Sequence, residues 1–257
     1  MGFRPAEFSN CARFNSALSS DFLELYESCI DEEIQTKSMQ PKHKSFAPSS
    51  SRCKRVSWFR LRGVQPDKVS KPDRGLQFTA DIGTACHEII QKRLISKFRE
   101  DWIDVAEYVK QKGFNYTVTK TGLESQVECT DIPVRFACDG LIRYKGKIRL
   151  LEIKSSDHAS FSDMSGPKLK HIDQVIFYCE RLDLDDVLFL YIDRQYGDVK
   201  CFELSVSIPQ KDAVKDTCQF VIDMVDANIA PDGLPKGDPD CTPDMCPYYE
   251  KCKEWGR

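Results

Sequence analysis

No long apolar run is present in this sequence. A membrane-spanning helix needs roughly 20 consecutive apolar residues, and no stretch of the 257-residue chain approaches that length. The opening residues, Met1 to Ala6, also lack the apolar core of a secretory signal peptide. The sequence therefore predicts a cytoplasmic protein with no membrane partner.

A strong excess of positive charge is also missing. The formal net charge is −3, which argues against a uniformly basic nucleic-acid protein. The charge is uneven, however, because the window from Ile34 to Pro66 contains no acidic residue. Its basic residues are Lys37, Lys42, Lys44, Arg52, Lys54, Arg55, Arg60 and Arg62. This window indicates either a local phosphate-binding surface or a solvated basic stretch.

Two further features bound the function. The sequence contains no Gly-x-x-x-x-Gly-Lys-Ser/Thr motif, so any DNA unwinding must come from a partner. Twelve cysteines are present, but in a chain of this size without an export signal they do not predict a disulfide scaffold. We expect most of them to be reduced, and those within apolar segments to be buried.

Hydrophobic periodicity predicts one α/β domain with appendages. Helices are expected over residues 16–30, 81–98, 168–182 and 211–228, and strands over 187–192 and 201–206. A hairpin between residues 127 and 154 should turn at Lys145-Gly146. A short basic helix, with Ser49 or Ser50 as its N-cap, should carry Cys53 in its first turns. The expected segments are an N-terminal helical extension (1–47), a basic segment (48–80), a core (81–230) and a Cys-rich tail (231–257).

Three residues in the expected hairpin carry chemistry. Asp139 and Glu152 flank the turn, which can bring their carboxylates together on neighbouring strands as a site for a hard divalent cation. Glu152 and Lys154 are two residues apart on one strand, so both side chains emerge on the same face. This set suits phosphodiester hydrolysis, because the cation neutralises the phosphate and the lysine can orient water. The structural alternative is a Glu152–Lys154 ion pair at a strand edge.

The segments Cys138-Asp139-Gly140 and Leu151-Glu152-Ile153-Lys154-Ser155 resemble the catalytic pattern of the PD-(D/E)XK nuclease superfamily, in its RecB-like branch. Two more elements follow the RecB-like order. They are Gly83-Thr84-Ala85-Cys86-His87 upstream and Gln174-x-x-x-Tyr178, preceded by His171, downstream. Singly, His87 could be a hydrogen-bonded helix histidine, and Gln174 with Tyr178 could be an ordinary polar helix face. Their joint order indicates a nuclease.

The resemblance implies a restriction-endonuclease-like core, with a central mixed β-sheet flanked by helices. It also implies a metal-dependent exonuclease that acts on single-stranded DNA or on free DNA ends. In that interpretation, the ligands of Mg²⁺ or Mn²⁺ are His87, Asp139, Glu152 and the carbonyl of Ile153. Lys154 activates water, and Gln174 and Tyr178 position the strand or Lys154. The residues that would contact DNA phosphates are Arg52, Lys54, Arg55, Arg60 and Arg62.

Three late cysteines, Cys241, Cys246 and Cys252, lie in a turn-rich tail that cannot form a large core alone. Cys53 is the best candidate for a fourth ligand. This distribution resembles CRISPR-associated RecB-like exonucleases and AddB-type helicase–nuclease subunits, which implies a structural [4Fe–4S] cluster. Those families separate the first two late cysteines by two residues, whereas four residues separate Cys241 from Cys246. Four thiolates also suit tetrahedral Zn²⁺, and cysteines without a metal are the third alternative.

Two other functions share these features. A site-specific or structure-specific endonuclease would use the same chemistry but would cut closed circular DNA. A non-catalytic DNA-binding or assembly protein could retain the same fold. The resemblance further implies a helicase, a recombination protein or a CRISPR-adaptation protein as partner, in a bacterial, archaeal or phage-infected cell.

Overall fold

The computed structural model describes residues 16–39, 43–67, 73–235 and 237–255. The expectation for the opening residues and the basic residue Lys42 lie outside them. The chain divides into two compact units, Met1–Pro41 with Val69–Phe78, and Lys42–Lys68 with Thr79–Arg257. Among the described residues, no helix combines the length and apolar character that crossing a membrane requires. The segment boundaries at residues 47, 80 and 230 remain proposals.

The first unit consists of helix α1 (Ser16–Met39) and the start of helix α3 (Arg74–Phe98). Arg74 joins them, because its guanidinium lies 2.6 Å from Glu27 Oε2 and 2.7 Å from Asp31 Oδ2. The helix expected over residues 16–30 is therefore confirmed and is longer than predicted. Phe22 and Tyr26 on its apolar stripe are exposed.

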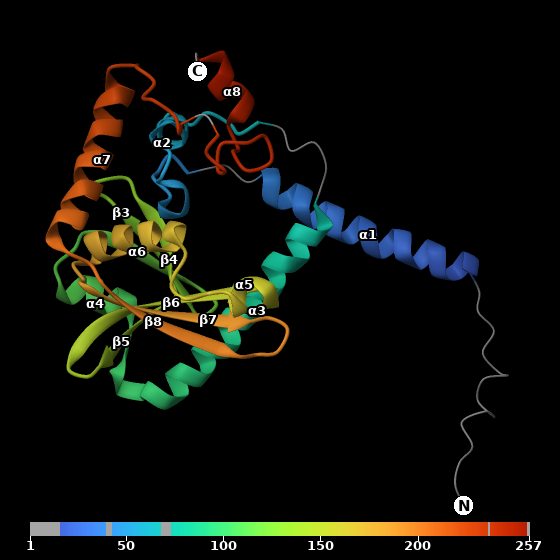
Figure 1. The fold of residues 1–257 in the computed structure, drawn as a ribbon, viewed down its shortest axis with the longest axis horizontal. Coiled ribbons are helices and arrows are strands. Elements are labelled where there is room, and N and C mark those ends of the chain that lie inside the picture. The colour runs from blue at the N-terminus through green and yellow to red at the C-terminus, as the bar shows by residue number, and fades with distance from the viewer. Residues whose placement is uncertain (1–15, 40–42, 68–72, 236, 256–257) are drawn as a thin grey trace, which may run out of the picture. The chain divides into compact units, whose positions relative to one another are not determined.

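A five-stranded sheet forms the centre of the second unit (Figure 1). Its strands are β1 (Trp102–Ile103), β5 (Gly140–Tyr144), β6 (Lys147–Ser156), β7 (Asp186–Asp193) and β8 (Val199–Ser205), in the order β1-β5-β6-β7-β8. Strands β6 and β7 are parallel, and the other neighbours are antiparallel. The predicted hairpin is confirmed as β5–β6. Its turn uses Lys145 and Gly146 at positive φ angles of 49° and 76°. Glycine adopts this left-handed conformation without strain.

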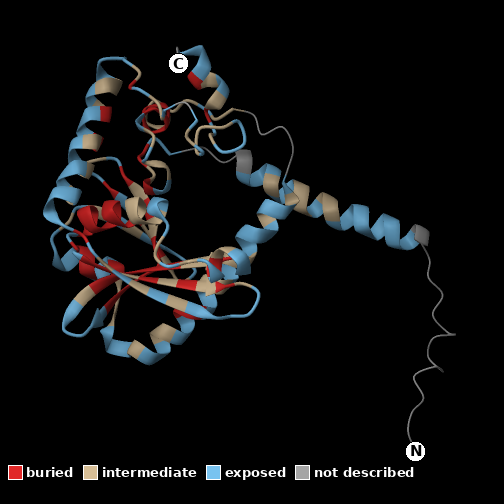
Figure 2. Cartoon of the chain, in the orientation of Figure 1, coloured by how far each residue is buried: buried red, intermediate tan, exposed pale blue. Residues whose placement is uncertain are grey.

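Helices cover both faces of this sheet. Leu150 and Val187 belong to the same core cluster as the buried residues of α6 (Leu169–Leu182), whereas Leu151 and Ile153 on the opposite face pack with Ile90 of α3. Helix α7 (Ile208–Asp226) contacts α6. Buried residues concentrate in the strands and in α6 (Figure 2). The predicted fold class, a mixed β-sheet flanked by helices, is confirmed.

A second sheet, absent from the sequence prediction, is formed by the chain between β1 and β5. Strands β2 (Tyr116–Thr121), β3 (Glu124–Cys129) and β4 (Arg135–Cys138) are antiparallel and follow helix α4 (Val105–Gln111). The expectation of one hairpin between residues 127 and 154 is therefore incomplete. The chain leaves the three-stranded sheet after Cys138 and enters the five-stranded sheet at Gly140.

The serine-rich segment differs from its prediction. Residues Pro48–Ser50 form a 3₁₀ turn, and helix α2 (Lys54–Leu61) begins later, with Cys53 as its N-cap. Ser50 and Ser51 donate their hydroxyls to the carbonyls of Ala47 and Pro48 at 3.3 and 2.8 Å. Because the serines close the preceding turn, the predicted N-cap at Ser49 or Ser50 is wrong. The remaining short elements are η3 (Arg99–Asp101), α5 (His158–Ser162) and α8 (Tyr249–Glu254).

Candidate metal and nucleic-acid site

Asp139 lies where the chain passes between the two sheets. In the three-stranded sheet Ser125 pairs with Cys138, so one further step along this register places Asp139 opposite Glu124. In the five-stranded sheet Gly140 pairs with Leu151, so the same step places Asp139 opposite Glu152. The sheet switch therefore brings three carboxylates together. They belong to Glu124 of β3, Glu152 of β6 and Asp139, which lies between β4 and β5.

The backbone holds Asp139 in a fixed orientation. Its Oδ2 atom accepts a hydrogen bond of 2.7 Å from the amide of Ile153, and its carbonyl accepts one of 2.7 Å from Gln91 Nε2. Next to it, a methyl group on Gly140 would come within 2.5 Å of the Trp102 ring. Glycine at position 140 thus leaves room for the Trp102 ring, while Oδ1 of Asp139 faces His87 of α3.

Helix α3 presents His87 to this carboxylate. His87 Nδ1 lies 3.1 Å from Asp139 Oδ1 and 3.5 Å from Glu124 Oε1. One ligand atom from each of the three residues lies within 4.8 Å of the others, so they could hold a metal ion. Burial lowers the pKa of His87, but its hydrogen bonds to Asp139 and Glu124 outweigh burial and raise that pKa to about 10. A cation would compete with that proton.

Glu124 was missed by sequence reasoning. It is the first residue of β3, two residues after a glycine turn, and nothing in its local sequence distinguishes it from an ordinary strand-edge acid. Only the pairing of β3 with β4 places it opposite Asp139. Gln91, which fixes the Asp139 backbone, lies four residues after His87 on α3 and is 1% exposed.

Glu152 and Lys154 emerge from β6 on the face covered by α6. Lys154 Nζ forms an ion pair with Glu152 Oε1, while Oε2 is buried without a hydrogen-bond partner in the described structure. Burial and then the charge of Asp139 raise the pKa of Glu152 to about 7, against the opposing effect of Lys154. An unpartnered carboxylate oxygen is costly in such a place, and a cation would satisfy it.

Helix α6 supplies the residues behind Lys154. Lys154 Nζ donates to Gln174 Oε1 at 3.3 Å, and Gln174 Nε2 donates to the hydroxyl of Tyr178. The Tyr178 ring stacks on Phe136 of β4 with 4.5 Å between centroids. His171, one turn earlier, contacts the hydroxyl of Tyr191 on β7 at 2.6 Å. The chain Tyr178–Gln174–Lys154 therefore orients the lysine toward Glu152.

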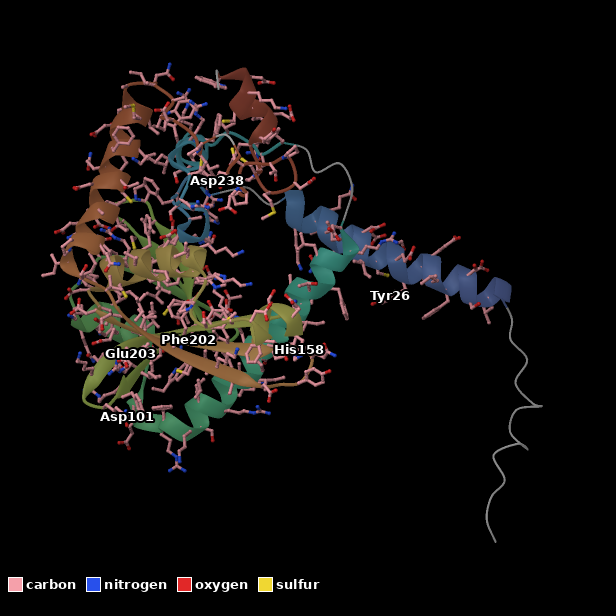
Figure 3. All side chains as sticks on the ribbon, viewed as in Figure 1. Tyr26, Asp101, His158, Phe202, Glu203 and Asp238 are labelled. Carbon is pink, nitrogen blue, oxygen red and sulfur yellow. The ribbon has the colours of Figure 1, made fainter. Side chains whose placement is uncertain are left out.

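The basic residues of the Arg52–Arg62 segment contact several parts of the second unit. Arg52 forms ion pairs with Asp238 (Figure 3) and Asp240 at 2.9 and 2.6 Å. Buried Arg55 donates to the Pro231 carbonyl at 2.7 Å. Lys54 lies 4.9 Å from the Phe220 ring centre, Arg62 lies 4.5 Å from the Trp58 ring centre, and Arg60 donates to the Ser45 carbonyl at 3.3 Å. The contacts of Arg52, Lys54, Arg55 and Arg60 thus connect α2 and its N-terminus to other segments, whereas the Trp58 contact of Arg62 is with α2 itself.

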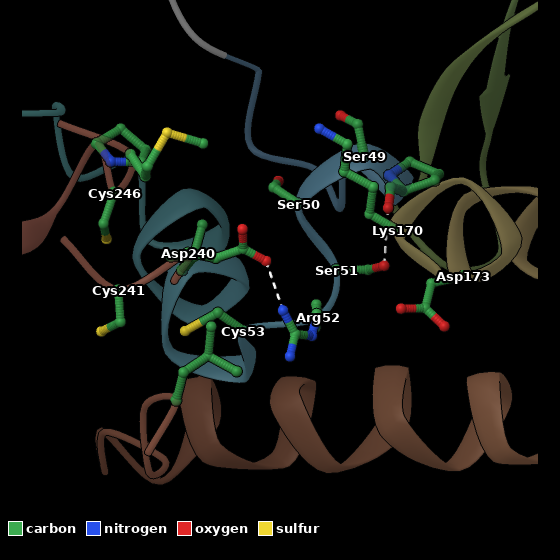
Figure 4. A pocket seen from close by; sticks show the side chains of 15 residues that line it. Ser49, Ser50, Ser51, Arg52, Cys53, Lys170, Asp173, Asp240, Cys241 and Cys246 are labelled. Atoms are coloured by element: carbon green, nitrogen blue, oxygen red, sulfur yellow. Dashed lines mark hydrogen bonds and ion pairs between the residues drawn. The ribbon is translucent and has the colours of Figure 1, made fainter. Parts of the chain in front are cut away.

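The cysteines predicted as cluster ligands lie in one region of the second unit. A cavity of about 180 Å³ is lined by Cys53, Cys241 and Cys246 (Figure 4). Burial raises the pKa of Cys246, and electrostatic interactions with Cys53, Cys241 and Cys252 also raise it. Arg55 Nη1 donates a hydrogen bond to Cys252 Sγ at 3.5 Å.

Comparisons with known proteins were of three kinds. No protein-family model matches the chain, and no curated protein matches it. Among solved structures, SSO0001 is 14% identical, with 89% of this chain and 96% of that chain covered and a TM-score of 0.48. The LHK-Exo complex with dAMP is 18% identical over 73% of this chain and 90% of that chain, with a TM-score of 0.43.

A further solved structure is the alkaline exonuclease LHK-Exo from Laribacter hongkongensis. It is 16% identical to this chain, over 75% of this chain and 93% of that chain, with a TM-score of 0.41. Every one of these TM-scores is below 0.5.

Proposed function

We propose that this protein is a metal-dependent deoxyribonuclease of the PD-(D/E)XK type, acting on DNA ends as an exonuclease. The observation that carries the proposal is the convergence of His87, Glu124 and Asp139 within 4.8 Å, beside the Glu152–Lys154 pair. A site with an unpartnered carboxylate oxygen and this donor set fits Mg²⁺ or Mn²⁺.

Each residue has a role in this proposal. Asp139, Glu152, His87 and Glu124 would hold the cation, with the Ile153 carbonyl as a further donor. When bound, the cation neutralises the scissile phosphate and acidifies water. Lys154 orients the attacking water, and Gln174 and Tyr178 fix Lys154. Arg60, which is half-buried on α2, would contact DNA phosphates.

We also propose a structural [4Fe–4S] cluster on Cys53, Cys241, Cys246 and Cys252. Three of these cysteines line one cavity, and Cys252 acts electrostatically on Cys246, which supports a shared metal group. The resemblance to iron–sulfur nucleases favours the cluster over Zn²⁺. Its role would be to connect α2 to the C-terminal segment, to which Arg52 and Arg55 already bind. A helicase, recombination or CRISPR-adaptation protein remains the proposed partner class.

The experiment that tests the nuclease compares wild type with Lys154→Ala and Glu152→Gln on end-labelled single- and double-stranded DNA with Mg²⁺ or Mn²⁺. We expect both substitutions to reduce hydrolysis by about a hundredfold or more, because they remove water orientation and a cation ligand. Lys92→Ala, an exposed lysine on α3, serves as the matched control and should retain activity.

Closed circular DNA separates the two nuclease classes. An end-dependent exonuclease leaves the circle intact, whereas an endonuclease linearises it. Thermal melting of each variant shows that loss of activity is not loss of fold. Equal degradation by wild type, Lys154→Ala and Glu152→Gln would refute the assignment. DNA binding without cleavage on every substrate would favour a non-catalytic assembly protein.

A further inference from the structure

A cavity of about 350 Å³ lies beside Gln174 and Tyr178. Its wall comes from the segment preceding α2, from Arg60 of α2, and from strands β3 and β4. The polar groups that face it, apart from those of α6, belong to His43, Ser45, Ser49, Arg60, Gln126 and Arg135. None of the lining residues is acidic, so the cavity carries positive charge in a chain whose net charge is negative.

Arg135 is the least engaged of these groups. Its guanidinium forms no hydrogen bond or ion pair within the described part of the chain, although Glu128 stands opposite it in the β3–β4 register. Arg60 uses Nε on the Ser45 carbonyl and retains two further guanidinium nitrogens as donors. Two guanidinium groups that converge on one cavity with donors to spare constitute an anion-binding arrangement.

The cavity and the metal site lie on the same face of β4 and its continuation. Side chains alternate along a strand, so Arg135, Ala137 and Asp139 point to one face of β4 and its continuation. Arg135 lies about 13 Å from Asp139 along the backbone, at four residues of roughly 3.3 Å each. Glu124 and Gln126 follow the same alternation on β3. An extended DNA strand with one phosphate at Asp139 would bring a nearby phosphate to Arg135.

We infer that this cavity binds a phosphate group of the substrate DNA strand, with Arg135 and Arg60 as its ligands. The inference rests on the proposed function for the identity of the strand. The volume lies at the lower end of the range for small-ligand sites, which suits one nucleotide and excludes a duplex. Phosphate contacts fix register, so this cavity would determine which phosphodiester bond reaches Asp139 and Lys154.

A terminal phosphomonoester and an internal phosphodiester share this chemistry. Binding is therefore measured by fluorescence anisotropy with Ca²⁺ in place of Mg²⁺, on one single-stranded oligonucleotide with a 5′-phosphate, a 3′-phosphate or neither. Arg135→Gln should weaken binding by about tenfold and reduce the salt slope by about 0.7 for each lost contact. Arg135→Lys, which keeps the charge, should recover part of the loss. Arg143→Gln, an exposed arginine on β5, is the matched control.

The outcomes separate the sources and the proposals. A loss confined to one phosphorylated oligonucleotide assigns the cavity to that terminus, and an equal loss on all three assigns it to an internal phosphate. Unchanged affinity and salt slope for Arg135→Gln on every oligonucleotide would overturn the inference. Because no cleavage is needed, an inactive wild type with Arg135-dependent binding refutes only the nuclease. An active wild type with Arg135-independent binding refutes only the cavity.

Discussion

At the scale of single residues, the two carboxylate oxygens of Asp139 have different partners. Oδ2 is held by the amide of Ile153, and this bond leaves Oδ1 directed at His87. A carboxylate constrained in this way loses little conformational entropy when it binds a cation. The neighbouring Glu124 is less constrained, with 29% of its side chain exposed.

Glu124 provides the residue-scale prediction. Glu124→Gln keeps the shape of the side chain but removes one anionic ligand, so Mn²⁺ affinity should fall by about tenfold or more. Titration of Mn²⁺ into DNA-free protein by calorimetry measures this directly. Glu128→Gln, which lies four residues after Glu124 on the same face of β3, is the control. Wild-type affinity in Glu124→Gln would remove this residue from the site.

At the scale of elements, helix α6 both packs on the sheet and carries polar residues to the site. Its buried side packs on the sheet through Val175 and Cys179, while its partly exposed polar side carries Gln174 toward Lys154. His171 connects the first turn of the helix to Tyr191 of β7. Burial, together with the charges of nearby lysines, lowers the pKa of His171 to about 3.

This pKa predicts a pH dependence of stability. The folded pKa of His171 lies below the unfolded value of about 6.5, so below that pH the unfolded chain binds a proton that the folded protein rejects. Stability should therefore fall as the pH decreases from 6.5 toward 3, by at most about 1.4 kcal/mol per pH unit from this group. Urea denaturation at pH 7, 6 and 5 should show a smaller slope for His171→Asn. Parallel pH profiles for the two proteins would contradict this assignment.

At the scale of the whole molecule, the second unit is held together across nearly its full sequence. Arg52 and Arg55, next to Cys53, contact residues 231, 238 and 240, and Phe59 of α2 stacks on Tyr248. A metal group bound by Cys53 and the three late cysteines would add a covalent link to these contacts. Removal of that group should therefore destabilise the whole unit rather than one loop.

The prediction at this scale concerns the cluster. Anaerobically purified protein should be brown, absorb broadly near roughly 400 nm, and contain iron with acid-labile sulfide. Loss of the cluster, by chelation or in Cys53→Ser, should lower the melting temperature by roughly 5–10 °C. Cys201→Ser, an exposed cysteine on β8, should change neither property. Stoichiometric zinc without sulfide would replace the cluster by a zinc site, and absence of any metal would refute both.

The sequence by itself determined the elements with strong local signals. The β5–β6 hairpin follows from Lys145-Gly146 between apolar strands, and α6 and β7 follow from their apolar periodicity. Asp139, Glu152, Lys154, His87, Gln174 and Tyr178 were all named from motif order, and the structure brings them together. Local patterns succeed here because spacing on one strand or helix fixes which side chains share a face.

Only the tertiary structure decided the rest. Glu124 and Arg135 gain their significance from the pairing of β3 with β4, which brings together residues that no local period relates. The sheet switch at Asp139 likewise depends on tertiary pairing, because β4 pairs with β3 and β5 pairs with β6. The basic run around Arg52 predicts an exposed phosphate-binding surface. In the structure, however, Arg55 is buried and donates to the Pro231 carbonyl. Pairing register and ion-pair partners depend on distant residues, and for that reason they are decided by the fold.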